Sequence, residues 1–276
     1  MTIKAMTIAG SDSGGGAGIQ ADLKTFQELG VFGTSVITAI TAQNTLGVTD
    51  VHPIPVLTIE EQFKAVITDI GADAVKTGML YDKERIEAIA DLVSRHQVTN
   101  LIVDPVMVTT TGSPLLKEDA QDTLIKKLFP LAILVTPNIP EAEAILSKKR
   151  EDFDKLEDMA KALYHACGGV PVLLKGGHEA RAEFMTDVLF TGQTSVLYTS
   201  PRIDTTHTHG TGCTYAAAIT AFIAQGVKLE SAIFKAKEFL HVAIEQAKPV
   251  GEGAGPVHHS AHRESSISDV NMEVLT

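Results

Sequence analysis

Residues 210–213 have the sequence Gly-Thr-Gly-Cys and stand directly before an alanine-rich run that predicts a long helix. Two glycines let the backbone turn tightly, so several N–H groups point outward from the amino end of that helix, where the helix dipole is positive. Such donors stabilise the charge of a phosphoryl group during its transfer. An ordinary junction between a loop and a helix is the alternative. The segment lacks the Gly-Lys-Ser/Thr of a P-loop, which excludes that class of nucleotide site.

Gly210-Thr211-Gly212 before a long helix resembles the signature of ribokinase-like kinases, in which an aspartate usually follows as the catalytic base. This chain has Cys213 there, as do hydroxymethylpyrimidine kinases and a related group of pyridoxal kinases. A thiol has a reference pKa of about 8.5, and a helix amino terminus lowers that pKa. We therefore expect a useful thiolate fraction near neutral pH, able to accept the proton of a substrate hydroxyl. Simple packing of Cys213 is the alternative.

A second glycine-rich motif follows the first predicted strand, at residues 9–22. The spacing excludes a dinucleotide-binding motif, because the third glycine of that motif, counted from Gly14, would have to stand at position 19, which is Ile19. The segment resembles the amino-terminal signature of hydroxymethylpyrimidine kinases, which implies a strand end and a loop that line the substrate pocket. Gly10 would let the substrate ring approach the backbone closely. Asp12 is either a pocket residue or a turn residue.

Other segments resemble the same family and imply the rest of the substrate pocket. Met79, after a predicted strand, would lie against the face of a heteroaromatic ring, although a methionine in an apolar run is more often a core residue. Val106 would line the same pocket. Gln43 has both a donor and an acceptor, so it can pair with the amino group and a ring nitrogen of an aminopyrimidine. Pyridoxal kinases with the same cysteine tend to differ at this glutamine.

Asp104 ends a buried apolar strand, where a carboxylate costs free energy unless it is paired or bound to a metal. The resemblance implies that Asp104 and Glu141 position Mg²⁺, and that Asn138, Lys175 and Thr208 bind ATP. Asn138 is also a good helix cap by residue type. Lys175 can reach a phosphate as a point charge, or it can be a surface residue without a role in binding.

Short β-branched runs alternate with amphipathic segments and supply the scaffold for these motifs. The predicted strands are 3–9, 34–41, 73–77, 100–104, 132–135 and 170–174, and the predicted helices are 16–29, 58–70, 82–96, 117–127, 139–146 and 154–167. This alternation predicts an α/β fold with a mostly parallel central sheet and helices on both faces, which is ribokinase-like by the resemblance. The motifs follow strands at their carboxyl ends, the edge where open α/β sheets bind ligands.

Residues 34–54 contain two successive strands without a helix between them, which predicts a small β-flap over one end of the sheet. Segments 184–190 and 194–199 read as a hairpin at the sheet edge. Two helices are predicted at about 212–225 and 228–247, and a strand-like run at 270–274 lies in the tail of about 260–276. No internal repeat or linker separates these parts. We therefore expect a single kinase domain over residues 1–276.

The formal net charge is −11, which argues against nucleic acid or an anionic membrane as a partner. No apolar run approaches the roughly 20 residues of a membrane helix, and the amino terminus lacks the pattern of a signal peptide, so we expect a cytoplasmic protein. Cys167 is expected to pack as a small buried residue. His207, His209 and His262 lack the spacing and the carboxylates of a metal site.

The resemblance extends from about residue 4 to residue 259 and implies an ATP-dependent kinase with Mg²⁺. The expected reactions are phosphorylation of 4-amino-5-hydroxymethyl-2-methylpyrimidine and then of its monophosphate, in thiamine biosynthesis. Pyridoxal kinase with the same fold and cysteine is the nearest alternative, and a non-catalytic pyrimidine sensor is an alternative of another class. Family members are commonly dimers, and a flap with unpaired edges favours a homodimer. His207 departs from the family, which often has asparagine there.

Overall fold

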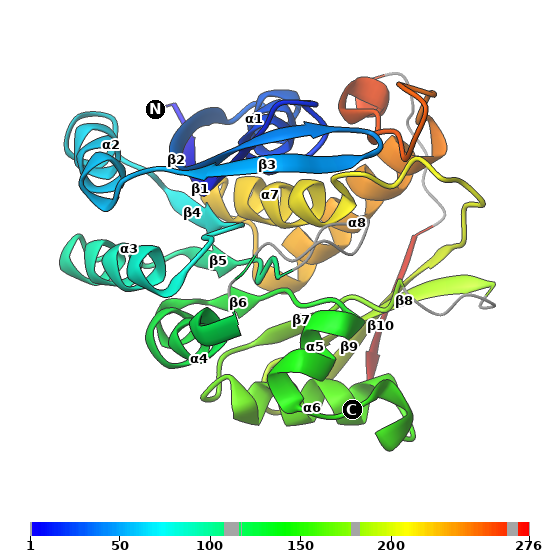
Figure 1. Cartoon of the computed structure of the whole chain (residues 1–276). Coiled ribbons are helices and arrows are strands. Elements are labelled where there is room, and N and C mark those ends of the chain that lie inside the picture. The colour runs from blue at the N-terminus through cyan, green and yellow to red at the C-terminus, as the bar shows by residue number, and fades with distance from the viewer. Residues whose placement is uncertain (1, 108–115, 117, 178–182, 264–269, 276) are drawn as a thin grey trace.

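The computed structural model of the chain describes residues 2–107, 116, 118–177, 183–263 and 270–275. Within this part of the chain, ten strands form one continuous sheet (Figure 1). The strands are β1 (Lys4–Asp12), β2 (Phe32–Asn44), β3 (Gly47–Pro53), β4 (Ala74–Thr77), β5 (Leu101–Val103), β6 (Leu134–Val135), β7 (Val172–Leu174), β8 (Phe184–Phe190), β9 (Ser195–Pro201) and β10 (Asn271–Leu275).

The order of the strands in the sheet is β10-β9-β8-β7-β6-β5-β4-β1-β2-β3. The pairs from β2 through β1, β4, β5 and β6 to β7 are parallel, while β7-β8, β8-β9, β9-β10 and β2-β3 are antiparallel. The predicted mostly parallel sheet is therefore confirmed. The predicted hairpin is also present as β8 and β9, but β10 pairs outside it and forms that edge of the sheet.

Helices cover both faces of the sheet (Figure 1). Helices α1 (Gly18–Glu28), α7 (Thr211–Ala224) and α8 (Leu229–Glu245) lie on one face. Helices α2 (Val56–Asp69), α3 (Lys83–Arg95), α4 (Gln121–Thr123), α5 (Ile139–Leu146) and α6 (Leu156–Ala166) lie on the other. Short 3-10 turns occupy Glu118–Ala120, Phe129–Leu131, Arg150–Asp152 and His259–Arg263, and a π-helical turn occupies Leu124–Leu128.

The central strands are buried on both faces because successive side chains point to opposite sides of a strand. In β7, Val172 and Leu174 join the cluster under α2, α3, α5 and α6, while Leu173 joins the cluster under α7 and α8. All three side chains are fully buried. This is why the parallel strands appear in the sequence as continuous apolar runs rather than alternating ones.

The flap is smaller than the predicted segment 34–54. Strand β2 pairs with β1 from Phe32 to Thr41, so its first half belongs to the main sheet. Strand β3 pairs only with residues 39–44 of β2. The flap therefore consists of the far end of β2, the turn and β3. The long run of β-branched residues continues through this boundary, so the sequence does not mark where β2 leaves the sheet.

Two other predicted elements differ in the structure, and a third is confirmed. Strand β1 continues to Asp12 rather than ending at residue 9, because an irregularity between Ala9 and Ser11 keeps it paired with β2. The predicted helix 117–127 is broken into 3-10, α and π turns, and residue 117 lies outside the described part of the chain. Strand β10 confirms the strand-like run in the tail, of which residues 264–269 and 276 are not described.

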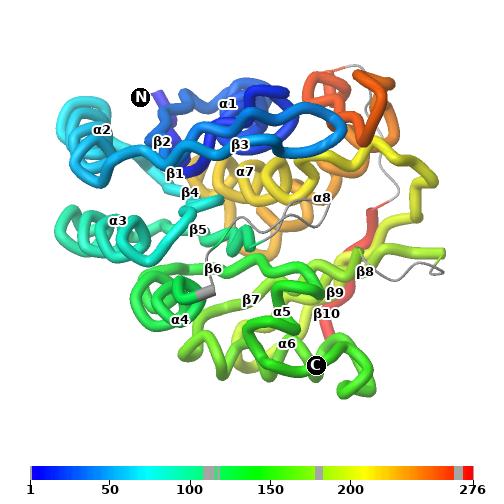
Figure 2. Tube along the Cα trace, viewed as in Figure 1, coloured from blue at the N-terminus to red at the C-terminus, as the bar shows by residue number. Residues whose placement is uncertain are grey.

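None of the helices in the described ranges is long and apolar enough to cross a bilayer. The tube in Figure 2 shows that α7, late in the chain, lies close to β1 and β4, which come early. This packing places the start of α7 beside the carboxyl ends of the parallel strands.

Core burial predicts the stability effect of two substitutions on α2. Phe63→Ala removes a fully buried ring and is expected to lower the free energy of unfolding by about 3–5 kcal/mol. Leu57→Ala on the same helix is the matched control, because Leu57 is 68% exposed, and we expect a change within about 0.5 kcal/mol. Urea unfolding of both variants measures the difference, and equal losses would contradict the assignment of α2 to the core.

Candidate active site

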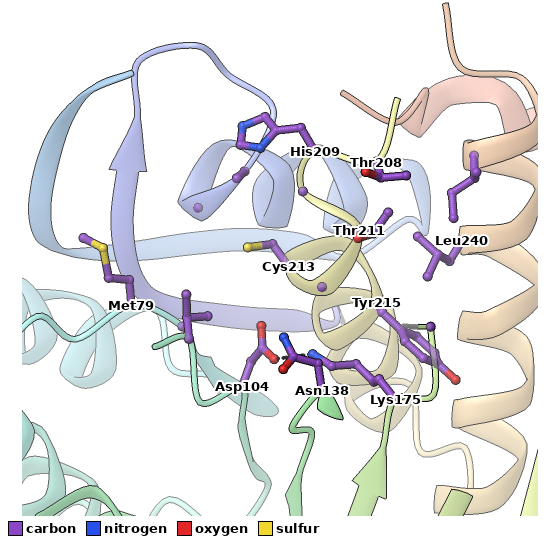
Figure 3. Close-up of a pocket in the computed structure, with 18 of the residues that line it drawn as sticks. Met79, Asp104, Asn138, Lys175, Thr208, His209, Thr211, Cys213, Tyr215 and Leu240 are labelled. Atoms are coloured by element: carbon purple, nitrogen blue, oxygen red, sulfur yellow. Dashed lines mark hydrogen bonds and ion pairs between the residues drawn. The ribbon is translucent and has the colours of Figure 1, made fainter. Parts of the chain in front are cut away.

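A pocket of about 650 Å³ lies where the carboxyl ends of β1, β4, β5 and β7 meet the start of α7. Every residue that the sequence proposed for a site lines this pocket: Gly10, Asp12, Gln43, Met79, Val106, Asp104, Asn138, Glu141, Lys175, Thr208, Gly210, Thr211, Gly212 and Cys213. Figure 3 shows Cys213 in the pocket, with Met79 to one side, Tyr215 and Leu240 to the other, and His209 above it. The pocket thus has a flap end and an α8 end, and Cys213 lies between them.

Two glycine-rich loops hold the pocket together, one at residues 14–18 and the other at 208–213. Gly210 precedes α7 with a φ of +82°, and a side chain there would collide with the carbonyl oxygen of Gly16. Gly18 begins α1 with a φ of +56°, and a side chain there would collide with the carbonyl oxygen of Gly10. These two positions require glycine both for their backbone conformation and for the close approach of another backbone.

Asp12 organises the first loop. Its Oδ1 accepts from the N–H of Gly14 at 2.8 Å, and its Oδ2 accepts from the N–H groups of Gly16 at 3.0 Å and Ala17 at 2.8 Å. His209 Nε2, from the second loop, lies 2.9 Å from Oδ2. Burial raises the pKa of Asp12, but the bonds from His209, Ala17 and Gly14 outweigh it and hold this pKa below its ordinary value. The interpretation of Asp12 as a turn residue is confirmed. A contact between Asp12 and the substrate stays a prediction.

At the flap end, the Gln43 carboxamide faces His209. Thr41 Oγ1 donates to Gln43 Oε1 at 3.2 Å, and Gln43 Nε2 lies 3.4 Å from His209 Nε2. Met79 is 7% exposed, so it is at once a core residue and part of the pocket wall. Its methyl group also occupies the space beside Gly10, where a Cβ would lie 2.6 Å from Met79 Cε. Met79 therefore occupies the space where a side chain of Gly10 would lie. Gly10 itself also lines the pocket.

Cys213 is the third residue of α7 and is half-buried, and the backbone N–H of Gly18 bonds to its thiol. Burial raises the pKa of Cys213 to about 11, and the charges of Asp22 and Asp104 add to this, while the charge of Lys76 opposes it. The predicted lowering of this pKa is therefore wrong for the ligand-free pocket. Desolvation outweighs the lowering effects of the Lys76 charge and of the bond from the Gly18 N–H.

Asp104 and Lys175 form an ion pair beside the start of α7 (Figure 3). Lys175 Nζ lies 2.8 Å from Asp104 Oδ1, which also accepts from Thr136 Oγ1 at 3.0 Å. Burial raises the pKa of Asp104, but the charges of Lys175 and Lys76 hold it below its ordinary value. The expectation that this buried carboxylate needs a partner is met by Lys175. Lys175 is therefore not a lone surface lysine, since it faces the pocket while bound to Asp104.

Asn138 and Glu141 form a capping box at the start of α5. Asn138 Oδ1 accepts from the N–H of Glu141 at 2.9 Å, and Glu141 Oε2 accepts from the N–H of Asn138 at 2.9 Å. The prediction that Asn138 caps a helix is confirmed. The cap uses only the side-chain carbonyl oxygen of Asn138. Burial raises the pKa of Glu141 to about 7, against the lowering effect of the Lys175 charge.

The two carboxylates fit a Mg²⁺ ion by their chemistry. Mg²⁺ takes oxygen ligands and is commonly held by one or two carboxylates together with substrate phosphates and water. Asp104 and Glu141 line the same pocket and interact electrostatically. No group of three or more His, Cys, Asp or Glu side chains suited to a metal occurs in the described ranges. The two carboxylates would leave the other coordination positions of Mg²⁺ to substrate phosphates and water.

The sequence reasoning missed several pocket residues. His209 was considered only as a metal ligand, although it contacts both Asp12 and Gln43. Lys76 lines the pocket floor and pairs with Asp22 of α1. The sequence signal for this pair was an aspartate on the buried face of an amphipathic helix, which needs a cationic partner. The wall of the α8 end had no local signal because distant segments build it: Met185, Pro201, Ile203, Leu240, His241 and Ile244.

A family model described as phosphomethylpyrimidine kinase matches residues 12–258. The chain belongs to the phosphomethylpyrimidine kinase family. It is 50% identical over 260 residues to a hydroxymethylpyrimidine/phosphomethylpyrimidine kinase of Haemophilus influenzae, which covers 93% of this chain and 96% of the relative. The Bacillus subtilis kinase of that name is 47% identical over 265 residues, 96% of this chain and 97% of the relative.

Solved structures add a second relationship to this family assignment. The pyridoxal kinase of Staphylococcus aureus in complex with AMP-PCP and pyridoxal superposes with a TM-score of 0.89. The match covers 100% of both chains at 34% sequence identity. The ribokinase-like α/β fold expected from the sequence is confirmed by this match. The backbone is therefore shared by kinases of two ring systems, and side chains in the pocket must decide between them.

The contact between the two glycine loops generates a prediction. Gly210→Ala is expected to lower the unfolding free energy by well over 1 kcal/mol, because strain at positive φ adds to the collision with Gly16. Gly226→Ala is the matched control: Gly226 has a φ of +80° at the end of α7 but meets no heavy atom within 4 Å. Its expected cost is about 1 kcal/mol, from strain alone. Thermal or urea unfolding compares the free energies of unfolding of the two variants. Equal losses would show that a side chain at position 210 does not collide with the other loop.

Proposed function

We propose that this protein transfers the γ-phosphoryl group of ATP to the hydroxymethyl group of 4-amino-5-hydroxymethyl-2-methylpyrimidine, and then phosphorylates the monophosphate to the diphosphate. The observation that carries the proposal is the position of Cys213 between the flap end and the α8 end of one pocket. The high identity to hydroxymethylpyrimidine/phosphomethylpyrimidine kinases supports the choice of substrate and a place in thiamine biosynthesis.

The flap end suits an aminopyrimidine. Gln43 offers an amide acceptor and two donors to the amino group and a ring nitrogen. Met79 and Val106 line the pocket and offer apolar contact to the ring faces. Asp12 and His209 hold the glycine loop and Gln43 in place. We assign Gly10, Gln43, Met79 and Val106 to the pyrimidine, and Asp12 to the support of its loop.

The α8 end suits ATP. Its wall includes the apolar side chains of Leu240, Ile244 and Ile203, which are available to pack against a base. Thr208, Asn138 and Lys175 line the path from this wall to Cys213 and offer hydrogen bonds and one positive charge to the phosphates. The N–H groups of Gly210 to Cys213, at the start of α7, would receive the transferring phosphoryl group.

Mg²⁺ is the cofactor we assign, and Asp104 and Glu141 are the residues that would hold it. The ion would neutralise phosphate charge during the transfer. Lys175 keeps Asp104 ionised in the ligand-free pocket, and Glu141 has a pKa near 7, so it is ready to lose its proton when positive charge approaches.

Cys213 is the base in this proposal. With a pKa of about 11, its thiol is about 10⁻⁴ ionised at pH 7 in the ligand-free pocket. The thiolate form accepts the proton of the substrate hydroxyl while the hydroxyl oxygen bonds to phosphorus and the bond from phosphorus to the leaving oxygen breaks. Turnover is expected to rise with pH above neutrality, because the fraction of thiolate rises.

The substrate assignment predicts the outcome of one assay. ATP consumption is measured with hydroxymethylpyrimidine, its monophosphate and pyridoxal side by side. We expect turnover of both pyrimidines and little turnover of pyridoxal. The match to the S. aureus pyridoxal kinase makes pyridoxal the one competing substrate, and preference for it would replace the proposed function by vitamin B6 salvage. Pyrimidine binding without ATP consumption would indicate a non-catalytic sensor.

The base assignment predicts that Cys213→Ala lowers kcat about 10²-fold or more while ATP binding survives. Cys167→Ala is the matched control, because Cys167 is buried in the core cluster under α6 and away from the pocket, and we expect near-normal kcat. Steady-state kinetics and calorimetric titration with ATP measure the two effects. Near-normal turnover of Cys213→Ala would remove the base assignment.

We also infer the domain organisation, the oligomeric state and the location of the protein. The continuous sheet and the absence of a linker in the sequence favour one kinase domain over residues 1–276. The flap exposes Ile40 and Leu46 and ends in the edge strand β3, which favours a homodimer through this surface. Biosynthesis of a coenzyme from ATP favours the cytoplasm as its location.

A further inference from the structure

A buried ion pair lies on the floor of the pocket and has no part in the mechanism so far. Lys76 Nζ, from β4, lies 2.9 Å from Oδ1 and 2.9 Å from Oδ2 of Asp22, from α1. Thr7 Oγ1, from β1, donates to Asp22 Oδ2 at 2.6 Å. Both side chains of the pair are 0% exposed. Three separate elements thus fix one ammonium group in one position.

Stability alone does not account for this pair. Removing two charges from water costs several kcal/mol per ion, and well-packed apolar residues in place of a buried pair are often neutral or stabilising. Burial lowers the pKa of Lys76, but the charges of Asp22, Cys213 and Asp104 raise it above its ordinary value. Lys76 therefore stays charged in the protein interior. Buried charges of this kind concentrate at functional sites.

Lys76 of this pair lines the pocket that contains the proposed base. Helix α7 packs against α1, β1 and β4, the elements that hold the pair, and Lys76 and Cys213 line the same pocket. The charge of Lys76 acts on the Cys213 thiol and favours its ionised form. Lys175 acts on Cys213 in the same direction, and Asp22 and Asp104 act against it. The Gly18 N–H also bonds to the sulfur.

We propose that Lys76, held in place by Asp22, is a positioning residue for Cys213, because its fixed ammonium stabilises the thiolate that accepts the proton of the substrate hydroxyl. The proposal rests on the base role of Cys213 given above. Asp22 has two effects: it holds the Lys76 ammonium in place, and its own negative charge offsets part of the effect of Lys76 on the sulfur. The two residues therefore act on Cys213 with opposite signs.

These opposite signs give the test. In a Cys167→Ala background Cys213 is the single cysteine, and its alkylation by iodoacetamide is measured from pH 7 to pH 11 on the ligand-free protein. The double variant Lys76→Met/Asp22→Asn removes both charges without leaving either one buried alone. We expect its alkylation at pH 8.5 to be about tenfold slower or more, since one pKa unit changes the thiolate fraction tenfold. Asp22→Asn alone leaves the ammonium without its counter-charge, and we expect faster alkylation.

Lys237 and Asp187 provide the matched control. They form a comparable buried pair between α8 and β8, with 2.6 Å from Lys237 Nζ to Asp187 Oδ2 and side chains 7% exposed. Lys237→Met/Asp187→Asn is expected to alkylate within about twofold of the parent, because the charges near the sulfur are unchanged. Circular dichroism tests whether each variant is folded. If the double variant is not folded, the alkylation rate of Asp22→Asn decides, and a faster rate than that of the parent supports the proposal.

An unchanged alkylation profile in the folded double variant, or a shift of the same sign in both variants, would overturn the proposal. The alkylation readout does not depend on any kinase substrate, so it separates this inference from the proposed function. A loss of kcat in the double variant at saturating ATP and pyrimidine, with the KM for ATP unchanged, would accompany the slower alkylation if Cys213 is the base. Slower alkylation with unchanged kcat would keep the electrostatic effect but remove its role in turnover.

Discussion

The α-carbon of Gly210 lies against the carbonyl oxygen of Gly16, in a contact that leaves no room for a side chain. This contact joins the loop after β1 to the loop before α7, two segments at opposite ends of the chain. It places His209 on Asp12 and, with Gly18, brings a backbone N–H to the sulfur of Cys213. Both ends of the pocket therefore depend on one close approach of two backbones, which only glycine permits.

Paired charges explain how a chain with a net charge of −11 can offer a site for ATP. Each buried carboxylate around the pocket has a cationic or potentially cationic neighbour within hydrogen-bond distance, except Glu141, which is held in the capping box and has a raised pKa. The pairs are Asp12 with His209, Asp22 with Lys76, Asp104 with Lys175, and Asp187 with Lys237. Local pairing of this kind removes much of the repulsion that isolated carboxylates would exert on phosphates.

The sequence predicted the parallel sheet and the pocket edge because these follow from local patterns. Apolar runs such as 172–174 show burial on both faces, and motifs after strands gather at one edge of the sheet. The pKa of Cys213 was predicted with the wrong sign. Its sequence neighbours reveal a helix start, whereas its desolvation comes from packing against α1 and the strands, which no local pattern shows.

Long-range pairing limits sequence reasoning in the same way elsewhere. Asp104 was recognised as a carboxylate that needs a partner, but nothing near it in the chain identifies Lys175, 71 residues away. Asp22 and Lys76 are 54 residues apart, and each looks like an ordinary polar residue in its own segment. The α8 end is built by residues of β8, β9 and α8 that line the pocket only once the sheet has formed.

The central claim is that Cys213 lies between a pyrimidine at the flap end and a nucleotide at the α8 end. A crystal structure with hydroxymethylpyrimidine and a non-hydrolysable ATP analogue tests it most directly. We expect the ring beside Gln43 and Met79, the hydroxymethyl oxygen within hydrogen-bond reach of Cys213 Sγ, and the terminal phosphate at the N–H groups that begin α7. A pyrimidine ring at the α8 end, or a hydroxymethyl group pointing away from Cys213, would contradict it.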